Sequence, residues 1–400
     1  MRLPRRASGA AVLPLAILLA LLAPVAPNAS GAEAPAGEPL KRIAFGSCLR
    51  QDDRQPVWAP LLKFDPQLFL FLGEAIYPES KDPQKVKEAY QVLAAVPLFR
   101  TFREKVPVMA TWDESDFGTK DGQGDAEAKE ESRKLFLDFW GEPKGSPRWS
   151  RPGVYDARLF GPPGRRVQVI LLDTRFNRSR LKKRWPWDLA FGPYAPDRDP
   201  KKTFLGPEQW AWLKEQLLVP AEIRLLCSSI QVVSSNHDYE KWGNFPLERS
   251  RLFELLRETR ATGVVVLSGD RHLAEISSAN AGIGYPLLDF TSSGLNVAVW
   301  NLRPAEENDH RVDGPFRDNN FGAILLEWDA GILTLQARSE DGIVRFERKI
   351  PFAELRPQPT PAAVPLVPLV PPVPLVPLVP PVPPVPASAP ASTPTPPASR

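Results

Sequence analysis

Short runs of consecutive hydrophobic residues recur along the middle of the chain. They are RIAFG from residue 42, LFLFLG from 68, VQVILLD from 167, IRLLCSSIQVV from 223 and GVVVLSGD from 263. Runs of this length that are rich in β-branched residues and apolar at successive positions are typical of strands buried on both faces. The pattern therefore predicts the buried strands of a sheet.

Stretches with helical periodicity lie between these runs. They cover residues 83–95, 126–140, 207–218 and 248–259, and the last three are rich in Glu, Lys and Arg on one side. Alternating strands and helices predict a layered α/β domain, which we expect to extend over residues 41–356. After Phe321 the pattern changes to FGAILLEWD and GILTLQARSEDGIVRFERK. These segments predict two or three strands, joined by Asp-Gly-type turns, that complete a sheet at its edge.

Residues 1–32 have the features of an export signal. MRLPRRASG is basic, residues 10–23 are apolar, and Ser30-Gly31-Ala32 is a small-x-small cleavage candidate. The apolar stretch is shorter than the about 20 helical residues needed to cross a bilayer, so we expect cleavage and no transmembrane helix afterwards. The alternative is an uncleaved anchor. Arg5-Arg6 leaves both the Sec and the twin-arginine route open. The protein is expected in the periplasm, at the cell surface or outside the cell, with residues 33–40 as a linker.

The segment 357–400 is rich in proline. It holds 18 of the 47 prolines, and the nonamer VPLVPLVPP occurs in it twice in succession. Proline at every second or third position removes backbone donors and fixes φ, so an extended, disordered tail is expected. Its predicted role is a stiff spacer, and the alternative is contact with the cell envelope or with a protein partner.

The composition is that of an ordinary globular protein. Hydrophobic residues make up 43% of the chain and charged residues 24%, and the formal net charge of +3 comes entirely from Arg2, Arg5 and Arg6. Without a block of like charge, the sequence carries no nucleic-acid-binding signature. The two cysteines could form a disulfide, but Cys227 is expected inside a strand and Cys48 on a loop, so we expect both thiols to be free.

Residues able to bind metals follow four of the predicted strands. The strand ends run into GSC at 46–48, GEAIY at 73–77, WDESD at 112–116 and GDRH at 269–272. Ligands collect outside the carboxyl ends of strands in open α/β sheets. A thiolate and a phenolate suit a trivalent or soft transition ion, whereas carboxylates suit a hard divalent one. Two adjacent cations can hold a phosphoryl group and lower the pKa of a bridging water.

Motifs over most of residues 41–350 resemble those of one family, the PhoD-like alkaline phosphatases of the calcineurin-like metallophosphoesterase superfamily. They are FGSC, LGEAIY, WDESD, LLDTR, SSIQVV, EKWGNFPLER, LSGDRHLAEIS and TSSGLN. The resemblance implies a four-layer αββα sandwich with mixed sheets, secretion, and a site of iron and calcium that hydrolyses phosphate mono- or diesters.

The resemblance also assigns the metal ligands. Cys48, Tyr77, Asp270 and His272 match the family pattern unchanged. Three more ligands come from the GEAIY and WDESD segments. The full predicted set is Cys48, Glu74, Tyr77, Asp113, Glu114, Asp270 and His272. Arg271, between two of them, either binds the phosphate of the substrate or forms a structural ion pair.

Two motifs depart from the family pattern. Glu74-Ala75 stands where the family has Asp-Asn, and Glu114-Ser115 stands where it has Asp-His, while Asp113 is kept. The family histidine faces the substrate, and a serine hydroxyl has too high a pKa to replace it as a general acid, so the catalytic group is left open. His237 is a candidate for a further metal ligand, with a loop residue of no special role as the alternative.

Two functions follow from these motifs. The first is an exported metal-dependent phosphoric ester hydrolase, attenuated by the loss of the histidine. The alternative is a pseudophosphatase that keeps the fold as a binding module. Retained acidity at Glu74 and Glu114 favours the first, and the changes at Ala75 and Ser115 favour the second.

Overall fold

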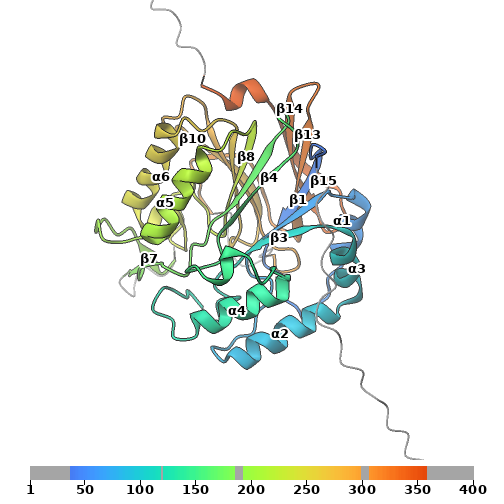
Figure 1. Ribbon diagram of the computed structural model, residues 1–400, viewed down its shortest axis with the longest axis vertical. Helices are drawn as coiled ribbons and strands as arrows, with labels where there is room; N and C mark the ends of the chain where they lie inside the picture. Colours follow the sequence, from blue (N-terminus) through green and yellow to red (C-terminus); the bar gives the residue numbers. More distant parts are fainter. Residues whose placement is uncertain (1–36, 119, 185–191, 299–305, 358–400) are drawn as a thin grey trace, which may run out of the picture. The chain divides into compact units, whose positions relative to one another are not determined.

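The computed structural model describes residues 37–118, 120–184, 192–298 and 306–357. The predicted signal, the first part of the predicted linker and the predicted tail from residue 358 lie outside the described residues. Within them, no helix has both the length and the apolar character that crossing a membrane requires. The described chain forms two large mixed sheets with helices on their outer faces (Figure 1).

The first sheet has six strands in the order β15-β14-β13-β1-β2-β3. Strands β1, β2 and β3 are parallel, and β13 to β15 continue the sheet in antiparallel pairs. The bounds are β1 (Arg42–Gly46), β2 (Leu68–Leu72), β3 (Val108–Thr111), β13 (Asn320–Glu327), β14 (Ile332–Ser339) and β15 (Val344–Pro351). The prediction that the last segments complete a sheet at its edge is confirmed.

The second sheet has seven strands in the order β12-β10-β11-β9-β8-β5-β4. Its centre, β11-β9-β8-β5, is parallel. The bounds are β4 (Asp156–Phe160), β5 (Val167–Leu171), β8 (Ile223–Ser228), β9 (Val264–Ser268), β10 (Ala274–Ala279), β11 (Leu287–Ser292) and β12 (Arg311–Phe316), and a separate ribbon pairs β6 (Lys182–Lys183) with β7 (Tyr194–Ala195).

The strand predicted from residue 223 is shorter than its hydrophobic run. β8 ends at Ser228, and the backbone amides of Val232 and Val233 donate to the buried carboxylate of Asp289 at 2.8 and 2.9 Å instead of to a neighbouring strand. The apolar residues of this run are therefore buried without belonging to the sheet.

Side chains of the first sheet alternate between two cores. Ile43 and Phe45 point toward the second sheet, and the ring of Phe45 meets that of Phe290 with centroids 5.0 Å apart. Ala44 points the other way, toward the helices. In β2 the leucines join the core between the sheets and the two phenylalanines join the core under the helices. This alternation produces four layers, which confirms the predicted αββα sandwich.

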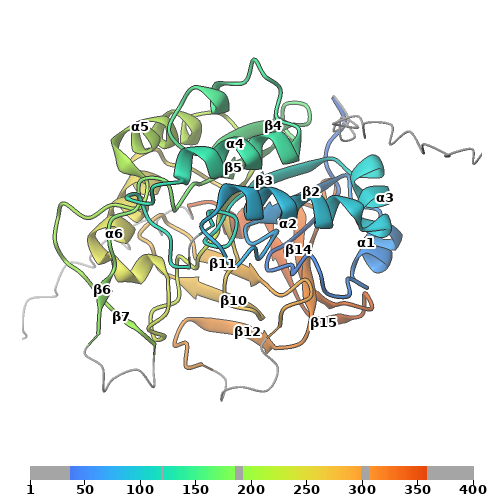
Figure 2. The same ribbon diagram turned by 90° about the horizontal axis from the view of Figure 1, so that it is seen from below.

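Helices cover both outer faces (Figures 1 and 2). They are α1 (Trp58–Phe64), α2 (Pro83–Ala95), α3 (Pro97–Lys105) and α4 (Lys129–Trp140) on the first sheet, and α5 (Gly206–Leu217) and α6 (Pro246–Glu258) on the second. The short 3₁₀ turns η1 (Pro147–Trp149), η3 (Trp242–Asn244) and η4 (Phe352–Leu355) lie in the connections. The four predicted helices are present. Two helices are additions, α1 and α3, and Pro97 separates α3 from α2.

Candidate metal centre

Loops that follow neighbouring strands are joined to one another by backbone hydrogen bonds. The amide of Cys48, after β1, donates to the carbonyl of Gly73, after β2, and the amide of Leu49 donates to the carbonyl of Glu74. The carbonyl of Ser47 accepts from two amides of the loop after β11. The strand ends that the sequence singled out therefore form one connected surface at the carboxyl edge of both sheets.

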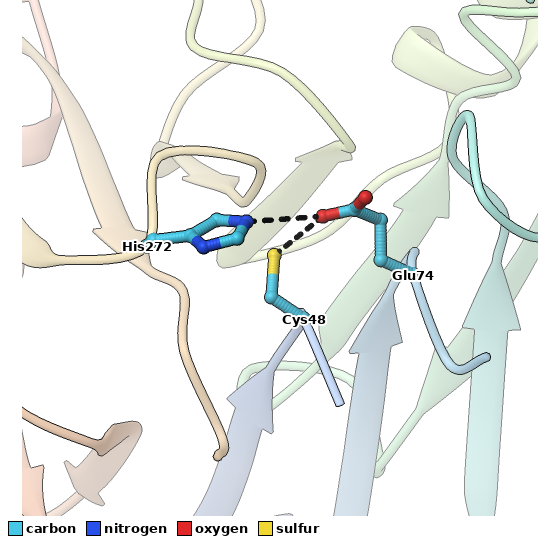
Figure 3. Close-up of side chains that lie close together, drawn as sticks. All are labelled: Cys48, Glu74 and His272. Atoms are coloured by element: carbon cyan, nitrogen blue, oxygen red, sulfur yellow. Dashed lines mark hydrogen bonds and ion pairs between the residues drawn. The ribbon is translucent and has the colours of Figure 1, made fainter. Parts of the chain in front are cut away.

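Three predicted ligands from three loops converge in this surface (Figure 3). The thiol of Cys48 donates to Oε2 of Glu74 at 2.8 Å, and Nε2 of His272 lies 3.6 Å from the same oxygen. The ligand atoms of the three residues all lie within 4.8 Å of one another. The hydroxyl of Tyr77 also donates to this oxygen, at 2.9 Å, and lies 3.5 Å from Nε2 of His272. Sulfur, carboxylate, imidazole and phenol donors thus surround one point, as a transition-metal site requires.

The backbone of this cluster adopts an unusual conformation. Cys48, Glu74, Asp270 and His272 have φ values of 60°, 55°, 67° and 55°. Non-glycine residues rarely occupy the left-handed region, and such residues concentrate at functional sites. The fold therefore holds four predicted ligands in a strained conformation that local sequence preference does not favour.

Asp116 fixes the loop that carries Glu74. Its carboxylate accepts from the backbone amides of Glu74 at 2.6 Å, Ala75 at 3.0 Å and Asp113 at 3.1 Å. Burial raises the pKa of Asp116 to about 7, against the opposing effect of these amides. Gly73, with φ of 99°, lies so close to Asp113 that an added Cβ would be 2.5 Å from the Asp113 Cβ. The GEAIY and WDESD segments therefore fold as one unit.

Ser115, at the position of the family histidine, is turned toward Glu74. Its hydroxyl donates to Oε1 of Glu74 at 2.8 Å, while Oε2 faces Cys48 and His272. The carboxylate is therefore oriented from both sides.

The structure places Asp113 and Glu114 in a neighbouring ion-pair network, apart from the Cys48 cluster. Arg175 is ion-paired with Asp113 and Glu240, and its Nη1 lies 4.0 Å from Oε2 of Glu114. Arg178 pairs with the second oxygen of Glu240. Sequence reasoning missed this network, although LLDTR and EKWGNFPLER, which contain Arg175 and Glu240, were among the motifs of the resemblance.

Burial and crowding perturb the pKa of several of these groups. Burial would raise the pKa of Glu74, but the hydrogen bond and charge of His272, with donors from Cys48 and Ser115, lower it to about 2. The pKa of Cys48 is raised well above its usual value by burial and then by the charge of Glu74. Burial likewise raises the pKa of Asp270, against the opposing charge of Arg271, and neighbouring carboxylates raise it further. A bound cation would relieve this crowding of acidic groups, so the donor set fits a metal.

A cavity of about 1190 Å³ opens beside the cluster. Its lining contains residues from the predicted motifs: Glu74, Tyr77, Glu114, Ser115, Asp270, Arg271 and His272. The rest of the lining is formed by Pro78, Glu79, Ser80, Lys81, Gly118, Lys120, Asp121, Pro193, Tyr194, Tyr239, Glu240, Leu273, Glu306 and Arg317. The cavity therefore exposes most of the predicted ligands to a substrate.

Ser293 is a second residue that sequence reasoning left without a role. Its Oγ lies 2.9 Å from the sulfur of Cys48 and accepts from the backbone amide of His272 at 2.8 Å. Accepting this bond uses a lone pair of the Ser293 oxygen, so the hydroxyl proton stays free to donate to the sulfur of Cys48. The TSSGLN motif after β11 was the available signal.

His237, the candidate for a further metal ligand, does not join the Cys48 cluster. His237 is buried, with Nε2 2.9 Å from Oε1 of Gln231, and it does not line the cavity. Cys48 and Cys227 are both buried and free, as predicted.

Comparisons with known proteins bear on the fold and on part of the sequence. Residues 159–300 match the sequence profile of the family described as PhoD-like phosphatase. A solved structure titled "Structure of PhoD" shares 15% identity and a TM-score of 0.62, over 80% of this chain and 73% of that one. The purple acid phosphatase PPD1 from yellow lupin (Lupinus luteus) seeds shares 12% identity and a TM-score of 0.55, over 79% of this chain and 55% of that one. No curated protein sequence matches.

The family match covers the second sheet from β4 through β11, where the motifs of the resemblance are densest. The two solved structures share the fold of the described residues. The profile match supports the resemblance that the motifs indicated over residues 159–300, and the two solved structures support the predicted fold.

Proposed function

We propose that this protein is a metal-dependent phosphoesterase, and that Cys48, Glu74, Tyr77 and His272 hold its first metal ion. One observation carries the proposal. The ligand atoms of Cys48, Glu74 and His272 lie within 4.8 Å of one another, in loops that follow strands of both sheets. Three of these four donors, Cys48, Glu74 and His272, stand on backbone with positive φ, and such conformations concentrate at functional sites.

The donor set suggests which ions bind. Thiolate and phenolate suit a trivalent or soft transition ion, and the carboxylates of Asp113, Glu114 and Asp270 suit a hard divalent ion beside it. The family resemblance implies that these ions are iron and calcium. When bound, such ions lower the pKa of a coordinated water and polarise the phosphoryl group. The substrate is a phosphate mono- or diester, and the predicted export signal places the reaction outside the cytoplasm.

The side chains define what the protein itself contributes. Ser115 orients Glu74 and has no acidic proton for a leaving group, so turnover should depend on esters whose leaving group needs no protonation. A general acid typically contributes 10²–10⁴-fold, and we expect a loss of about this size on esters of weakly acidic alcohols. The binding-module alternative is not favoured, because Cys48, Glu74, Tyr77 and His272 converge even though Ala75 and Ser115 replace family residues.

One experiment tests the metal dependence. Metal content of the purified full-length protein would be measured by mass spectrometry, together with turnover of p-nitrophenyl phosphate and bis-p-nitrophenyl phosphate from pH 7 to 10. We expect at least one tightly bound transition metal and measurable turnover. Absent metal and absent turnover, restored together by Glu74→Asp with Ser115→His, would instead indicate a phosphatase fold turned to binding.

A further inference from the structure

One nitrogen of the Arg271 guanidinium, Nη2, already has an acidic partner in the cavity. Arg271 lies between Asp270 and His272 in the loop after β9, and its side chain is 11% exposed. Nη2 is ion-paired with Glu306, Nη1 lies 3.6 Å from Asp270, and the guanidinium is over the ring of Tyr239, 4.6 Å from its centroid. All of these residues line the cavity.

Arg311 holds the backbone at Glu306. Nη2 of Arg311 donates to the backbone carbonyl of Glu306 at 2.6 Å, and Nε of the same arginine is paired with Glu275 in β10 at the same distance. The side chain of Glu306 is 24% exposed, so its carboxylate is open to the cavity on one side. The carboxylate of Glu306 that pairs with Arg271 therefore extends from a backbone that Arg311 holds.

A guanidinium recognises carboxylates and phosphates with the same pairs of N–H groups. A phosphate that entered the cavity and used Nη2 of Arg271 would have to displace Glu306 or share the guanidinium with it. The cavity lining also carries seven acidic residues against four Lys and Arg. Glu306 therefore opposes each additional negative charge on a ligand at the Arg271 atom that would bind it.

We propose that Glu306 is a specificity-determining residue that occupies Arg271 and lowers the affinity of the site for doubly charged phosphate groups relative to singly charged ones. This inference rests on the proposed function, because it concerns the same cavity. It predicts that the native protein favours phosphodiesters and binds inorganic phosphate weakly.

The test measures binding, so that it can be read without turnover. Calorimetry on the full-length protein would give the affinity for inorganic phosphate and for dimethyl phosphate, in the unsubstituted protein and in Glu306→Gln. We expect Glu306→Gln to bind inorganic phosphate about tenfold more tightly, which corresponds to about 1.4 kcal/mol, and dimethyl phosphate less than about threefold more tightly. In an Arg271→Lys background the gain should largely disappear, because lysine lacks the planar fork.

Two control variants remove the same charge elsewhere. Glu79→Gln removes an acid from the cavity lining that is paired with Arg50, and Glu307→Gln removes an exposed acid next in sequence to Glu306. Both should change phosphate affinity by less than about threefold. Equal gains in Glu79→Gln and Glu306→Gln would overturn the proposal in favour of general cavity charge. Unchanged phosphate affinity in Glu306→Gln and Glu306→Ala would show that the pair is only structural.

Kinetics separate this proposal from the proposed function. In Glu306→Gln we expect a lower KM for p-nitrophenyl phosphate, with little change in kcat or in the KM for bis-p-nitrophenyl phosphate. If no variant hydrolyses any ester, the proposed function fails, while the calorimetric comparison still decides the role of Glu306.

Discussion

Arg175 and Asp113 form an ion pair in which both side chains are fully buried. Two ions in the protein interior have lost their hydration, and each is stabilised mainly by the other. Glu240 adds a second carboxylate on the same guanidinium, and Arg178 compensates its charge. The network fixes the WDESD loop against the segment that follows β5. Because the WDESD loop contacts the loop that carries Glu74, the network also helps to position the Cys48, Glu74 and His272 cluster.

Removing Arg175 should therefore destabilise the whole domain. We expect Arg175→Met to lower the free energy of unfolding by about 3–5 kcal/mol, because it leaves Asp113 and Glu240 as buried charges with too few partners. The matched control is Arg180→Met, which breaks the exposed pair with Asp125 and should cost below about 1 kcal/mol. Denaturant titration of both variants gives the comparison. Equal losses would mean that the buried network contributes no more than a surface ion pair.

The two cysteines offer a matched test of metal binding. Both are buried and free, but only Cys48 lies among other metal-binding groups, whereas the sulfur of Cys227 has a backbone carbonyl at 3.7 Å as its partner. We expect Cys48→Ala to lose metal affinity by more than the about 10–100-fold typical for an outer partner of a ligand, and Cys227→Ala to keep its metal. Metal content by mass spectrometry after dialysis measures both.

Chelation should act on the same site. Since bound metal stabilises only the folded state, a chelator should lower the melting temperature of the unsubstituted protein and of Cys227→Ala, but not that of Cys48→Ala. A melting temperature that falls equally in all three proteins would place the stabilising metal elsewhere.

Gly73 should tolerate no side chain. Alanine there would adopt φ of 99° at a strain of about 1–2 kcal/mol, and the contact of its Cβ with Asp113 adds about 1–3 kcal/mol of overpacking. Gly141→Ala is the control, because Gly141 has φ of 72° but open space around its Cβ. Unfolding free energies that fall equally in the two variants would show that Gly73 is needed for its conformation alone. A larger fall in Gly73→Ala is expected, with loss of bound metal.

Much of this architecture could be predicted from the sequence because buried strands carry a strong local signal. β2 and β9 are apolar at nearly every position and bounded by glycine, so both their existence and their ends were predictable. Knowing where those strands end was enough to propose that Glu74 and His272 lie near Cys48. The sequence signal is weaker for β12, whose residues are exposed or half-buried and which pairs with β10 through register shifts.

The partners of buried charges could not be predicted in this way. Arg175 and Asp113 are separated by 62 residues, and their pairing depends on how two loops without regular structure fold over the sheets. Nothing in the local sequence distinguishes an arginine that will pair with a predicted metal ligand from one that faces solvent. The same limit applies to Arg271. The sequence leaves both substrate binding and ion pairing open for this residue, and its pair with Glu306 is visible only in the structure.

Lys241 should make stability depend on alkaline pH. Its side chain is buried, and its ammonium donates to the carbonyl of His237. Burial disfavours the charged form and, with repulsion from Arg271, outweighs the attraction of Asp238, so the pKa falls to about 8 in the folded protein. An unfolded chain has a lysine pKa of about 10.4. Between these values the unfolded state holds the proton and the folded state does not, so the contribution of Lys241 to stability rises with pH.

Lys241→Met isolates this contribution. The difference in unfolding free energy between the unsubstituted protein and the variant should shift in favour of the unsubstituted protein as pH rises from 8 to about 10, and stay level below pH 7. Denaturant titrations at pH 6, 7, 8, 9 and 10 would measure it, with Lys214→Met, an exposed lysine of α5, as the control. Parallel curves for the unsubstituted protein and Lys241→Met over this range would mean that the buried lysine keeps its proton, and that the hydrogen bond to His237 fully compensates for burial.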